Sequence, residues 1–283
     1  MNMKRIPFWP VFLLALLLSA CGRPAENNDH TMNGMIRESP SPAATTSPVA
    51  GSPLVSEAPP SASPETATEE PTPKLYRMND AFRFEPLSKE TTNKAVLLTF
   101  DDGPINKDIL LSLLDTLDKH EAKAIFFVNG YRVKQNPDLL KLIHERGQTI
   151  GNHSWDHINL KNESEQSVEQ QIGDLQTEIE SLTGEKPKFF RPPYGSGGDL
   201  VRNTAKNHGM LYMTWSNGSL DWDKSTKDKP AEVIRNVLEQ LHPGANILMH
   251  ELRWTADALD ELLTKLEEKG YSFIDPAAIE TNR

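Results

Sequence analysis

Two adjacent carboxylates, Asp101 and Asp102, directly follow an apolar run in the stretch AVLLTFDDGP, residues 95–104. The run predicts a buried strand, on which successive side chains point to opposite faces. Two ionised carboxylates at this spacing repel each other unless a cation or a chemical task separates them. We therefore expect the pair at the end of this strand to belong to a site.

Two histidines four residues apart, His153 and His157 in the segment HSWDH, supply imidazole nitrogens further along the chain. With one carboxylate they make an open three-ligand set that suits Zn²⁺ or a similar ion and leaves room for a water. The ion would lower the pKa of that water, and the second carboxylate could take its proton. His250, after another apolar run, could protonate a leaving group. Taken alone, the two histidines could equally be hydrogen-bonded loop residues, and His250 a capped core histidine.

Short apolar runs alternate with amphipathic stretches from about residue 92 onward, which predicts a parallel α/β fold. The predicted strands are 95–100, 124–128, 148–152, 188–191, 211–215, 246–250 and 271–274. No glycine-rich phosphate fingerprint marks a doubly wound sheet. We therefore expect a distorted (β/α)7-type barrel with its active site at the C-terminal ends of the strands.

Polar segments follow five of these seven predicted strands, at the end where such a barrel gathers its active residues. The segments are Asp101–Asp102, HSWDH (153–157), RPPYG (191–195), SNGSLDW (216–222) and His250. Their common placement predicts one site built from several strand ends. Trp222, beside a carboxylate in a loop, is a candidate wall for stacking on a sugar.

In this order, TFDDGP, HSWDH, RPPYG, LDW and LMH resemble the five motifs of the polysaccharide deacetylases with a NodB homology domain, carbohydrate esterase family 4. The segment KAIFFVNG (123–130) also resembles their second strand. The resemblance covers about residues 93–275. It implies a distorted (β/α) barrel that depends on one divalent metal ion and removes N-acetyl groups from glycans. Zn²⁺ is the expected ion, with Co²⁺, Mn²⁺ or Ni²⁺ as alternatives.

The resemblance also implies which residues bind the metal and act as the base. Asp102, His153 and His157 match the Asp-His-His metal triad of the family. Asp101 matches its catalytic base, and Arg191 matches the arginine that pairs with that base. Of the two adjacent aspartates, Asp102 would thus bind the metal and Asp101 would act as the base.

The remaining motif residues match the groups that complete the family's reaction. His250 matches the catalytic histidine and Asp221 the carboxylate that orients it. The backbone N–H of Tyr194 matches the donor that stabilises the oxyanion. Tyr194 is also a predicted substrate-binding residue. Trp222 and Leu248 match the walls of the acetyl pocket.

One position departs from the family pattern, because Gly218 stands where the fourth motif often has its first aspartate. This departure puts the shape of that loop, and with it substrate preference, in doubt. The expected reaction is deacetylation of a cell-wall glycan, with peptidoglycan N-acetylglucosamine as the substrate and acetate as a product. RPPYG resembles the glucosamine-type members more than the muramic-type ones.

Other substrates and one other class of function remain as alternatives. The substrate could instead be chitooligosaccharide, poly-N-acetylglucosamine or O-acetylated xylan. The chain could also be a glycan-binding surface lipoprotein with little turnover, or a structural lipoprotein of the wall. The intact set of motif residues favours the enzyme.

The beginning of the chain predicts export. Lys4 and Arg5 precede an apolar stretch that ends in LSAC, and residues 1–21 resemble a signal peptide with a bacterial lipobox. Cys21, the one cysteine, would be lipidated; an ordinary signal peptide or anchor with an incidental cysteine is the alternative. We therefore expect an extracytoplasmic protein that is lipid-anchored to a bacterial cell membrane.

The composition of the rest of the chain indicates a tether, a lead-in segment and a folded domain. Residues 22–75, rich in proline, serine and threonine, predict a disordered tether because they cannot bury enough apolar area. Residues 76–92 are a lead-in segment, and 93–283 the deacetylase domain. A net charge of −10 over 283 residues leaves no basic stripe for nucleic acid. We expect a monomer whose partners are an acetylated glycan polymer and, through its lipid, the membrane.

Overall fold

The computed structural model describes residues 72–282. The predicted signal peptide with Cys21, and nearly all of the predicted tether, lie outside these residues. In the described part, strands and helices alternate along the chain as the sequence predicts. No helix between residues 72 and 282 is both long and apolar enough to cross a membrane.

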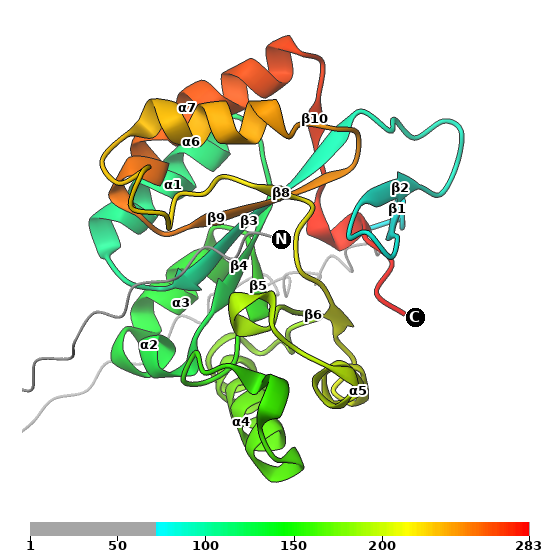
Figure 1. Ribbon diagram of the computed structural model, residues 1–283, viewed down its shortest axis with the longest axis vertical. Coiled ribbons are helices and arrows are strands. Elements are labelled where there is room, and N and C mark those ends of the chain that lie inside the picture. Colours follow the sequence, from blue (N-terminus) through cyan, green and yellow to red (C-terminus); the bar gives the residue numbers. More distant parts are fainter. Residues whose placement is uncertain (1–71, 283) are drawn as a thin grey trace, which may run out of the picture. The chain divides into compact units, whose positions relative to one another are not determined.

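A parallel sheet forms the centre of the fold (Figure 1). Its strands are β3 (Ala95–Gly103), β4 (Ala124–Val128), β5 (Thr149–Asn152), β6 (Phe189–Phe190), β7 (Leu211–Tyr212), β8 (Asn217–Gly218), β9 (Ala245–His250) and β10 (Ser272–Phe273). They lie in the order β7-β6-β5-β4-β3-β9-β8, and β10 pairs with the start of β3. Since no described pairing joins β7 to β8, the sheet is an open half-barrel, the distorted form of the barrel that the sequence predicts.

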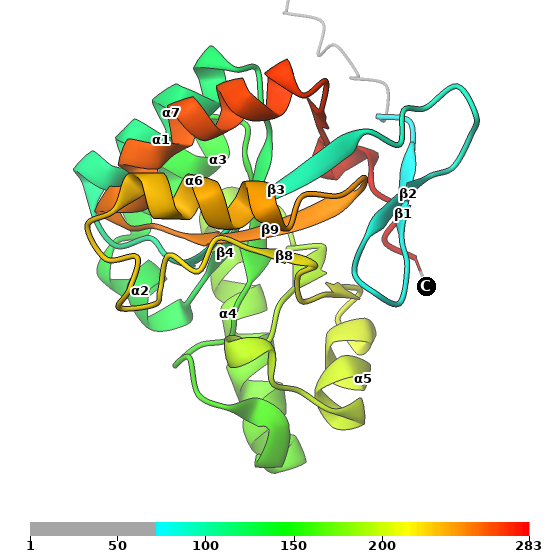
Figure 2. The ribbon, with the colours of Figure 1, turned by 45° about the horizontal axis from the view of Figure 1, so that its top comes forward.

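Helices cover the outer face of this half-barrel. They are α1 (Lys107–Lys119), α2 (Gly130–Gln135), α3 (Pro137–Glu145), α4 (Glu165–Thr183), α5 (Asp199–Asn207), α6 (Pro230–Glu239) and α7 (Arg253–Glu268). Figures 1 and 2 show α1, α6 and α7 side by side over β3 and β9. Helices α2 and α5 carry little local sequence signal, because α2 is short and α5 is largely polar and buries few side chains.

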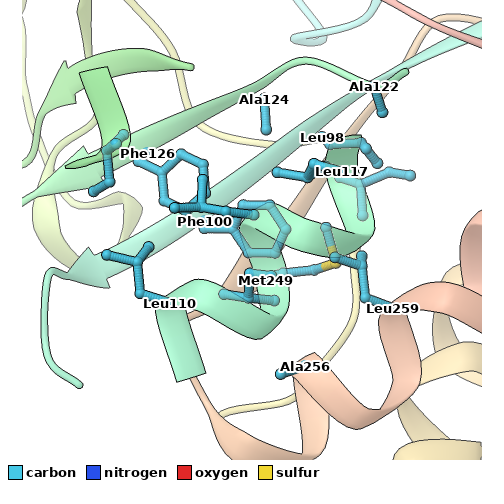
Figure 3. Packing of buried hydrophobic residues seen from close by; sticks show 14 of the residues in the cluster. Leu98, Phe100, Leu110, Leu117, Ala122, Ala124, Phe126, Met249, Ala256 and Leu259 are labelled. Carbon is cyan, nitrogen blue, oxygen red and sulfur yellow. The ribbon is translucent and has the colours of Figure 1, made fainter. Parts of the chain in front are cut away.

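Alternation along β3, β4 and β9 sends every second side chain outward to the helices. Leu98 and Phe100 of β3, Phe126 of β4 and Met249 of β9 lie in one buried cluster with Leu259 of α7 (Figure 3). The rings of Phe100 and Phe126 stack with their centroids 5.0 Å apart. This packing locks the three central strands to the helices and so fixes the strand ends in space.

The inward face of the same strands carries a second apolar cluster, which we call the interior cluster. Its members are Tyr76, Met78, Phe84, Ala95, Leu97, Ile125, Phe127, Phe189, Leu211, Met213, Ile274 and Ile279. Three of them come from an antiparallel hairpin of β1 (Tyr76–Met78) and β2 (Phe84–Pro86), within the predicted lead-in segment. The hairpin thus packs against the N-terminal ends of the central strands.

Gly244 makes the close approach of this hairpin possible. The Phe84 N–H donates a 2.8 Å hydrogen bond to the Gly244 carbonyl, just before β9 begins. Gly244 has a φ of +69°, and a Cβ there would lie 1.9 Å from the Phe84 carbonyl oxygen. Only glycine tolerates both the left-handed backbone and this contact.

Candidate active site

The C-terminal ends of the strands bring the sequence-predicted chemical residues to one edge of the half-barrel. We call this edge the rim, and its members are Asp101, Asp102, His153, His157, Arg191, Asp221 and His250. The strand pairings place Asp101 opposite His250, at the ends of β3 and β9. Predicted strand ends that lie far apart in the chain therefore meet in space.

A β-bulge decides how the two adjacent aspartates point. The predicted strand 95–100 continues to Gly103, so the prediction that it ends before the pair is wrong. Asp101 and Gly103 pair with consecutive residues of β4, and the register shift between them leaves Asp102 unpaired with a φ of +70°. Alternation sends Asp101 inward, and the bulge re-aims Asp102 toward the same site.

Asp102, His153 and His157 form a donor set that fits a divalent ion. Asp102 Oδ1 lies 3.1 Å from His157 Nε2 and 3.5 Å from His153 Nε2. In a tetrahedral zinc site with metal–ligand distances near 2.1 Å, neighbouring ligand atoms lie roughly 3.4 Å apart. This oxygen is also buried without a hydrogen-bond partner among the described residues, as expected of an atom placed for a metal.

His153 is held in the form that can bind a metal. Its Nδ1 donates a 2.7 Å hydrogen bond to the Arg191 carbonyl, which leaves the Nε2 lone pair directed at the aspartates. Burial lowers the pKa of His153 to about 3, so the imidazole is neutral. The Asn129 side chain donates to the His153 carbonyl at 2.8 Å and fixes the loop from behind. Such outer partners orient metal ligands.

Asp101 is a buried carboxylate paired with a buried arginine. Arg191 Nη1 donates to Asp101 Oδ1 at 2.7 Å, while Asp101 Oδ2 lies 3.7 Å from His153 Nε2. Burial raises the pKa of Asp101, and the charge of Arg191 partly offsets this rise. One oxygen is thus occupied by the guanidinium, and the other faces the donor set.

The guanidinium of Arg191 is itself held at four points inside the half-barrel. Its Nη1 also donates to Thr99 Oγ1 at 2.8 Å, and its Nη2 donates to the Thr214 carbonyl and to Asn246 Oδ1. The Phe127 ring lies beneath it, with its centroid 4.3 Å from the guanidinium carbon. These contacts fix the buried guanidinium and so the direction from which Asp101 is held.

His250 and Asp221 form a second, tightly locked pair. His250 Nδ1 donates to Asp221 Oδ1 at 2.7 Å, and Asp221 Oδ2 accepts from the His250 backbone N–H and from Thr255 Oγ1. Burial opposes protonation of His250, but the charge and hydrogen bond of Asp221, with the charges of Asp101 and Asp102, raise its pKa to about 9. His250 is therefore a cation at neutral pH, with Nε2 4.0 Å from Asp102 Oδ2.

Two exposed aromatic side chains flank the rim. Tyr194, 66% exposed, has a left-handed backbone with φ +60°, and its ring meets His157 edge-on at 4.7 Å. Trp222, 45% exposed, lies 5.3 Å from the His250 ring. Leu248, the third predicted substrate contact, is buried on the inward face of β9. The rim thus has an exposed aromatic side chain beside His157 and another beside His250.

Gly218 keeps the fourth motif in place despite its departure from the family pattern. It pairs with Leu248 of β9, and the side chain of Gln240 hydrogen-bonds both its N–H and its carbonyl. A Cβ at this position would meet Trp222 at 3.4 Å, an ordinary contact. With glycine at this buried position, Asp221 still lies beside His250, and the Trp222 ring is the nearest neighbour that a side chain at 218 would meet.

Comparison with known proteins places this arrangement in a family. A family model described as polysaccharide deacetylase matches residues 88–213. The peptidoglycan-N-acetylglucosamine deacetylase PgdA of Listeria monocytogenes is 41% identical over 188 residues. The peptidoglycan-N-acetylmuramic acid deacetylase PdaA of Bacillus subtilis is 33% identical over 185 residues, which are 65% of this chain and 70% of that protein. The chain belongs to the polysaccharide deacetylase family.

The extent of these similarities differs between relatives. The match to the Listeria protein covers 66% of this chain but 39% of that protein, so the chain spans about two fifths of that relative's length. The crystal structure of a carbohydrate esterase family 4 pseudoenzyme from Bacillus anthracis superposes with a TM-score of 0.62 at 34% identity and covers 66% of each chain. The half-barrel is thus the fold of this family, and the predicted fold class is confirmed.

Sequence reasoning found the charged residues of the rim but missed the neutral ones that hold them. Thr99, Asn246 and Thr255 bind Arg191 or Asp221, and Asn129 supports the histidine loop. Thr99 and Asn246 carried a signal, since each is a polar residue inside an apolar strand at the inward register. Thr255 lies on a helix with nothing in its local sequence to mark it.

Proposed function

We propose that the chain is a metal-dependent hydrolase that removes N-acetyl groups from peptidoglycan N-acetylglucosamine and releases acetate. The observation that carries this proposal is the convergence at the rim. Asp101 and Asp102 each lie within 4.0 Å of His153 Nε2, and Asp102 lies within 4.0 Å of His250 Nε2 as well. A base, a metal donor set and an acid are the groups that amide hydrolysis at neutral pH requires.

Asp101 acts as the base. Its Oδ2 takes a proton from the attacking water, because Arg191 occupies Oδ1 and holds the carboxylate still. A divalent ion held by Asp102, His153 and His157 would supply Lewis acidity to the amide carbonyl and acidity to the water. As the new C–O bond forms, the Tyr194 N–H donates to the carbonyl oxygen, which gains negative charge.

His250 acts as the acid. Its Nε2 proton passes to the amine nitrogen as the C–N bond breaks, so the sugar amine and acetate separate. Asp221 supports this step in two ways, because it fixes the tautomer through Nδ1 and keeps His250 protonated. A pKa of about 9 means that the acid is charged before the reaction begins.

The exposed aromatic side chains support a sugar substrate. Tyr194 lies beside the metal-donor residue His157 and Trp222 beside the acid His250, and aromatic faces suit the apolar faces of sugar rings. The relatives act on both peptidoglycan sugars according to their names: two glucosamine deacetylases are 41% and 35% identical to this chain and two muramic acid deacetylases 37% and 33%, so the highest of these four identities belongs to a glucosamine deacetylase. We therefore propose N-acetylglucosamine as the acetylated residue.

A glycan-binding protein with little turnover is the second candidate. The similarity to a pseudoenzyme of carbohydrate esterase family 4 favours it, because that protein has the fold at 34% identity. Against it stand the base, the donor set, the arginine and the acid, which are all present here and in mutual contact. Turnover separates the two candidates.

The test is acetate release from purified peptidoglycan, chitooligosaccharide and acetylated xylan, with and without added Zn²⁺, Co²⁺, Mn²⁺ or Ni²⁺. We expect release from peptidoglycan, loss of activity after chelation and recovery on adding metal. Mass spectrometry of muramidase digests would show whether the free amine lies on glucosamine or on muramic acid. Binding to peptidoglycan without acetate release, with every metal, would support the second candidate and contradict the enzyme.

We also propose that the chain is exported and held at the bacterial cell membrane by a lipid on Cys21, and that it acts as a monomer. The lipobox-like segment supports the anchor, and the origin of every rim residue in one chain supports the monomer. Metabolic labelling with a fatty-acid analogue should mark the wild-type chain and not Cys21→Ala. Equal labelling of both would contradict the anchor.

A further inference from the structure

Glu251 is a buried carboxylate that the proposed reaction does not use. It follows His250 at the end of β9 and is 1% exposed. Its Oε1 accepts hydrogen bonds from the backbone N–H groups of Ile105 and Asn106, both at 2.8 Å. A carboxylate is costly to remove from water unless such bonds compensate it. Its burial therefore points to a task in holding residues 105 and 106.

The segment that Glu251 holds is the turn that links β3 to α1. A Cβ at Gly103 would lie 2.6 Å from Glu251 Oε2, so glycine at this position leaves the carboxylate the room it occupies beside the turn. Asn136, between α2 and α3, also donates from Nδ2 to the Pro104 carbonyl at 3.2 Å. The turn is thus clamped by side chains from two other elements.

The clamped turn, residues 104–106, begins two residues after the metal-donor aspartate. Asp102 is the unpaired residue of the bulge and has a φ of +70°, a conformation that a residue with a side chain keeps only where its surroundings impose it. If the turn were released, Asp102 could relax toward ordinary extended geometry. Its Oδ1 would then move away from the Nε2 atoms of His153 and His157.

We propose that Glu251 is a positioning residue that clamps the turn after β3 and thereby sets the metal affinity of the Asp102, His153 and His157 donor set. It acts through backbone hydrogen bonds rather than through its charge. The inference deepens the proposed function, because it rests on the metal site that this function requires.

Two conservative variants separate hydrogen-bond geometry from charge. Glu251→Gln keeps an Oε1 that can accept both N–H groups but loses the charge, whereas Glu251→Asp keeps the charge but is one methylene too short. In a calorimetric or competitive titration with Zn²⁺, Glu251→Gln should bind about as tightly as wild type. Glu251→Asp should bind roughly 10- to 100-fold more weakly, the usual effect of removing an outer partner of a metal ligand.

Amide hydrogen exchange and enzyme kinetics test whether Glu251 changes metal affinity through the turn at residues 105 and 106. The N–H groups of Ile105 and Asn106 should exchange faster in Glu251→Asp than in wild type and Glu251→Gln. At saturating metal, Glu251→Asp should recover most of its kcat with KM unchanged, because the loss lies in metal binding. Gly244→Ala is the matched control, since it disturbs the distant hairpin and should leave metal affinity at the wild-type value.

The outcomes are distinct. Wild-type metal affinity in Glu251→Asp, or loss in Glu251→Gln with retention in Glu251→Asp, would overturn the proposal. An equal loss in Gly244→Ala would show general destabilisation and overturn it as well. If the wild-type chain bound no divalent ion, the proposed metal-dependent function itself would fail, and this result is visible before any variant is made.

Discussion

The interior cluster and the rim occupy the same inward face of the same strands, yet they differ in chemistry. On β3, Leu97 belongs to the interior cluster, and Asp101, four residues further along the same face, belongs to the rim. Leu97 is surrounded by apolar side chains, whereas Asp101 touches a guanidinium and faces an imidazole. The beginning of β3 thus contributes apolar packing that stabilises the fold, and its end contributes a residue of the candidate active site.

Backbone strain and unsatisfied polar atoms are concentrated toward the rim. Among residues 72–282, eight non-glycine residues have a positive φ, and five of them, Asp102, Ser154, His157, Tyr194 and Leu220, lie at or just after strand ends that carry rim residues; the other three are Phe82, Glu121 and Asp228. The buried polar atoms without a hydrogen-bond partner in this part of the chain belong to Asp102, Asn129, Arg132, Ser154, Arg191, Asn217 and Glu251, and most of these residues lie in or beside the rim. The interior cluster contributes none of them.

The difference between the interior cluster and the rim shows how the packed part of the fold holds an active site with unfavourable local geometry. Local conflicts with ordinary backbone and hydrogen-bonding rules are expected at functional sites, and the rest of the structure must hold them. Here the helices and the β1–β2 hairpin pack the strands from both faces, so the strand ends can keep geometry that each loop alone would not adopt. Changes at the two regions should therefore have separable effects.

The largest effect on catalysis should come from Asp101→Asn at the rim. The amide cannot accept the water's proton, so the rate of acetate release should fall roughly 10²- to 10⁴-fold. The interior cluster is untouched, and metal binding should persist because Asp102 and both histidines remain. Turnover assays with a parallel Zn²⁺ titration check this, and full activity would remove Asp101 from the mechanism.

The second prediction concerns His250 and pH. Since its pKa is raised from 6.5 to about 9, its protonated form persists through neutral pH, and deacetylation should fall as pH rises through about 9. Its stabilising contribution is fully present below pH 6.5 and is lost as pH rises through about 9. Asp221→Asn should lower the His250 pKa and move the alkaline fall in rate to lower pH.

An NMR titration of His250 together with the pH–rate profile measures both halves of this prediction. His250→Gln should abolish the pH-dependent change in stability between these values. If the rate of the Asp221→Asn variant fell at the same alkaline pH as the wild-type rate, the role of Asp221 in keeping His250 charged would be contradicted.

The interior cluster can be disturbed alone by Gly244→Ala. The new Cβ would collide with the Phe84 carbonyl, so the hairpin must shift, and the free energy of unfolding should fall by at least about 1–3 kcal/mol. Gly184→Ala is the matched control, because Gly184 also has a positive φ but a Cβ there meets nothing within 4 Å. Urea unfolding compares the two variants, and kcat of the folded protein should stay at the wild-type value in both.

The smallest effect should come from Trp222→Ala, which removes an exposed ring beside His250 but replaces none of the charged groups of the rim. Loss of a stacking partner should raise KM roughly threefold to tenfold, or about 0.5–1.5 kcal/mol, with little change in kcat. Leu75→Ala, an exposed apolar residue near the hairpin, is the control and should leave KM unchanged. A fall in kcat with unchanged KM would instead place Trp222 in the chemical step.

Much of the fold could be predicted because its signals are local. The long amphipathic helices α1, α4 and α7 and the apolar strands β3, β4 and β9 carry their periodicity in consecutive residues. The two-residue strands β6 and β7 lie inside the predicted strands 188–191 and 211–215, whereas β8, residues Asn217–Gly218, carries no apolar pattern, and its pairing with β9 alone defines it. The hairpin of β1 and β2 was missed because its apolar residues become buried only against distant strands.

The sequence by itself determined the residues of the site and, through the order and spacing of their motifs, the family they resemble. Tertiary structure alone decided their geometry. The bulge at Asp102 is set by the pairing with β4 and by groups such as Glu251, which lies about 150 residues away in the chain. The amino-acid sequence states which chemical groups are present. The orientation of a carboxylate such as that of Asp102 depends on contacts that form only when the strands pair.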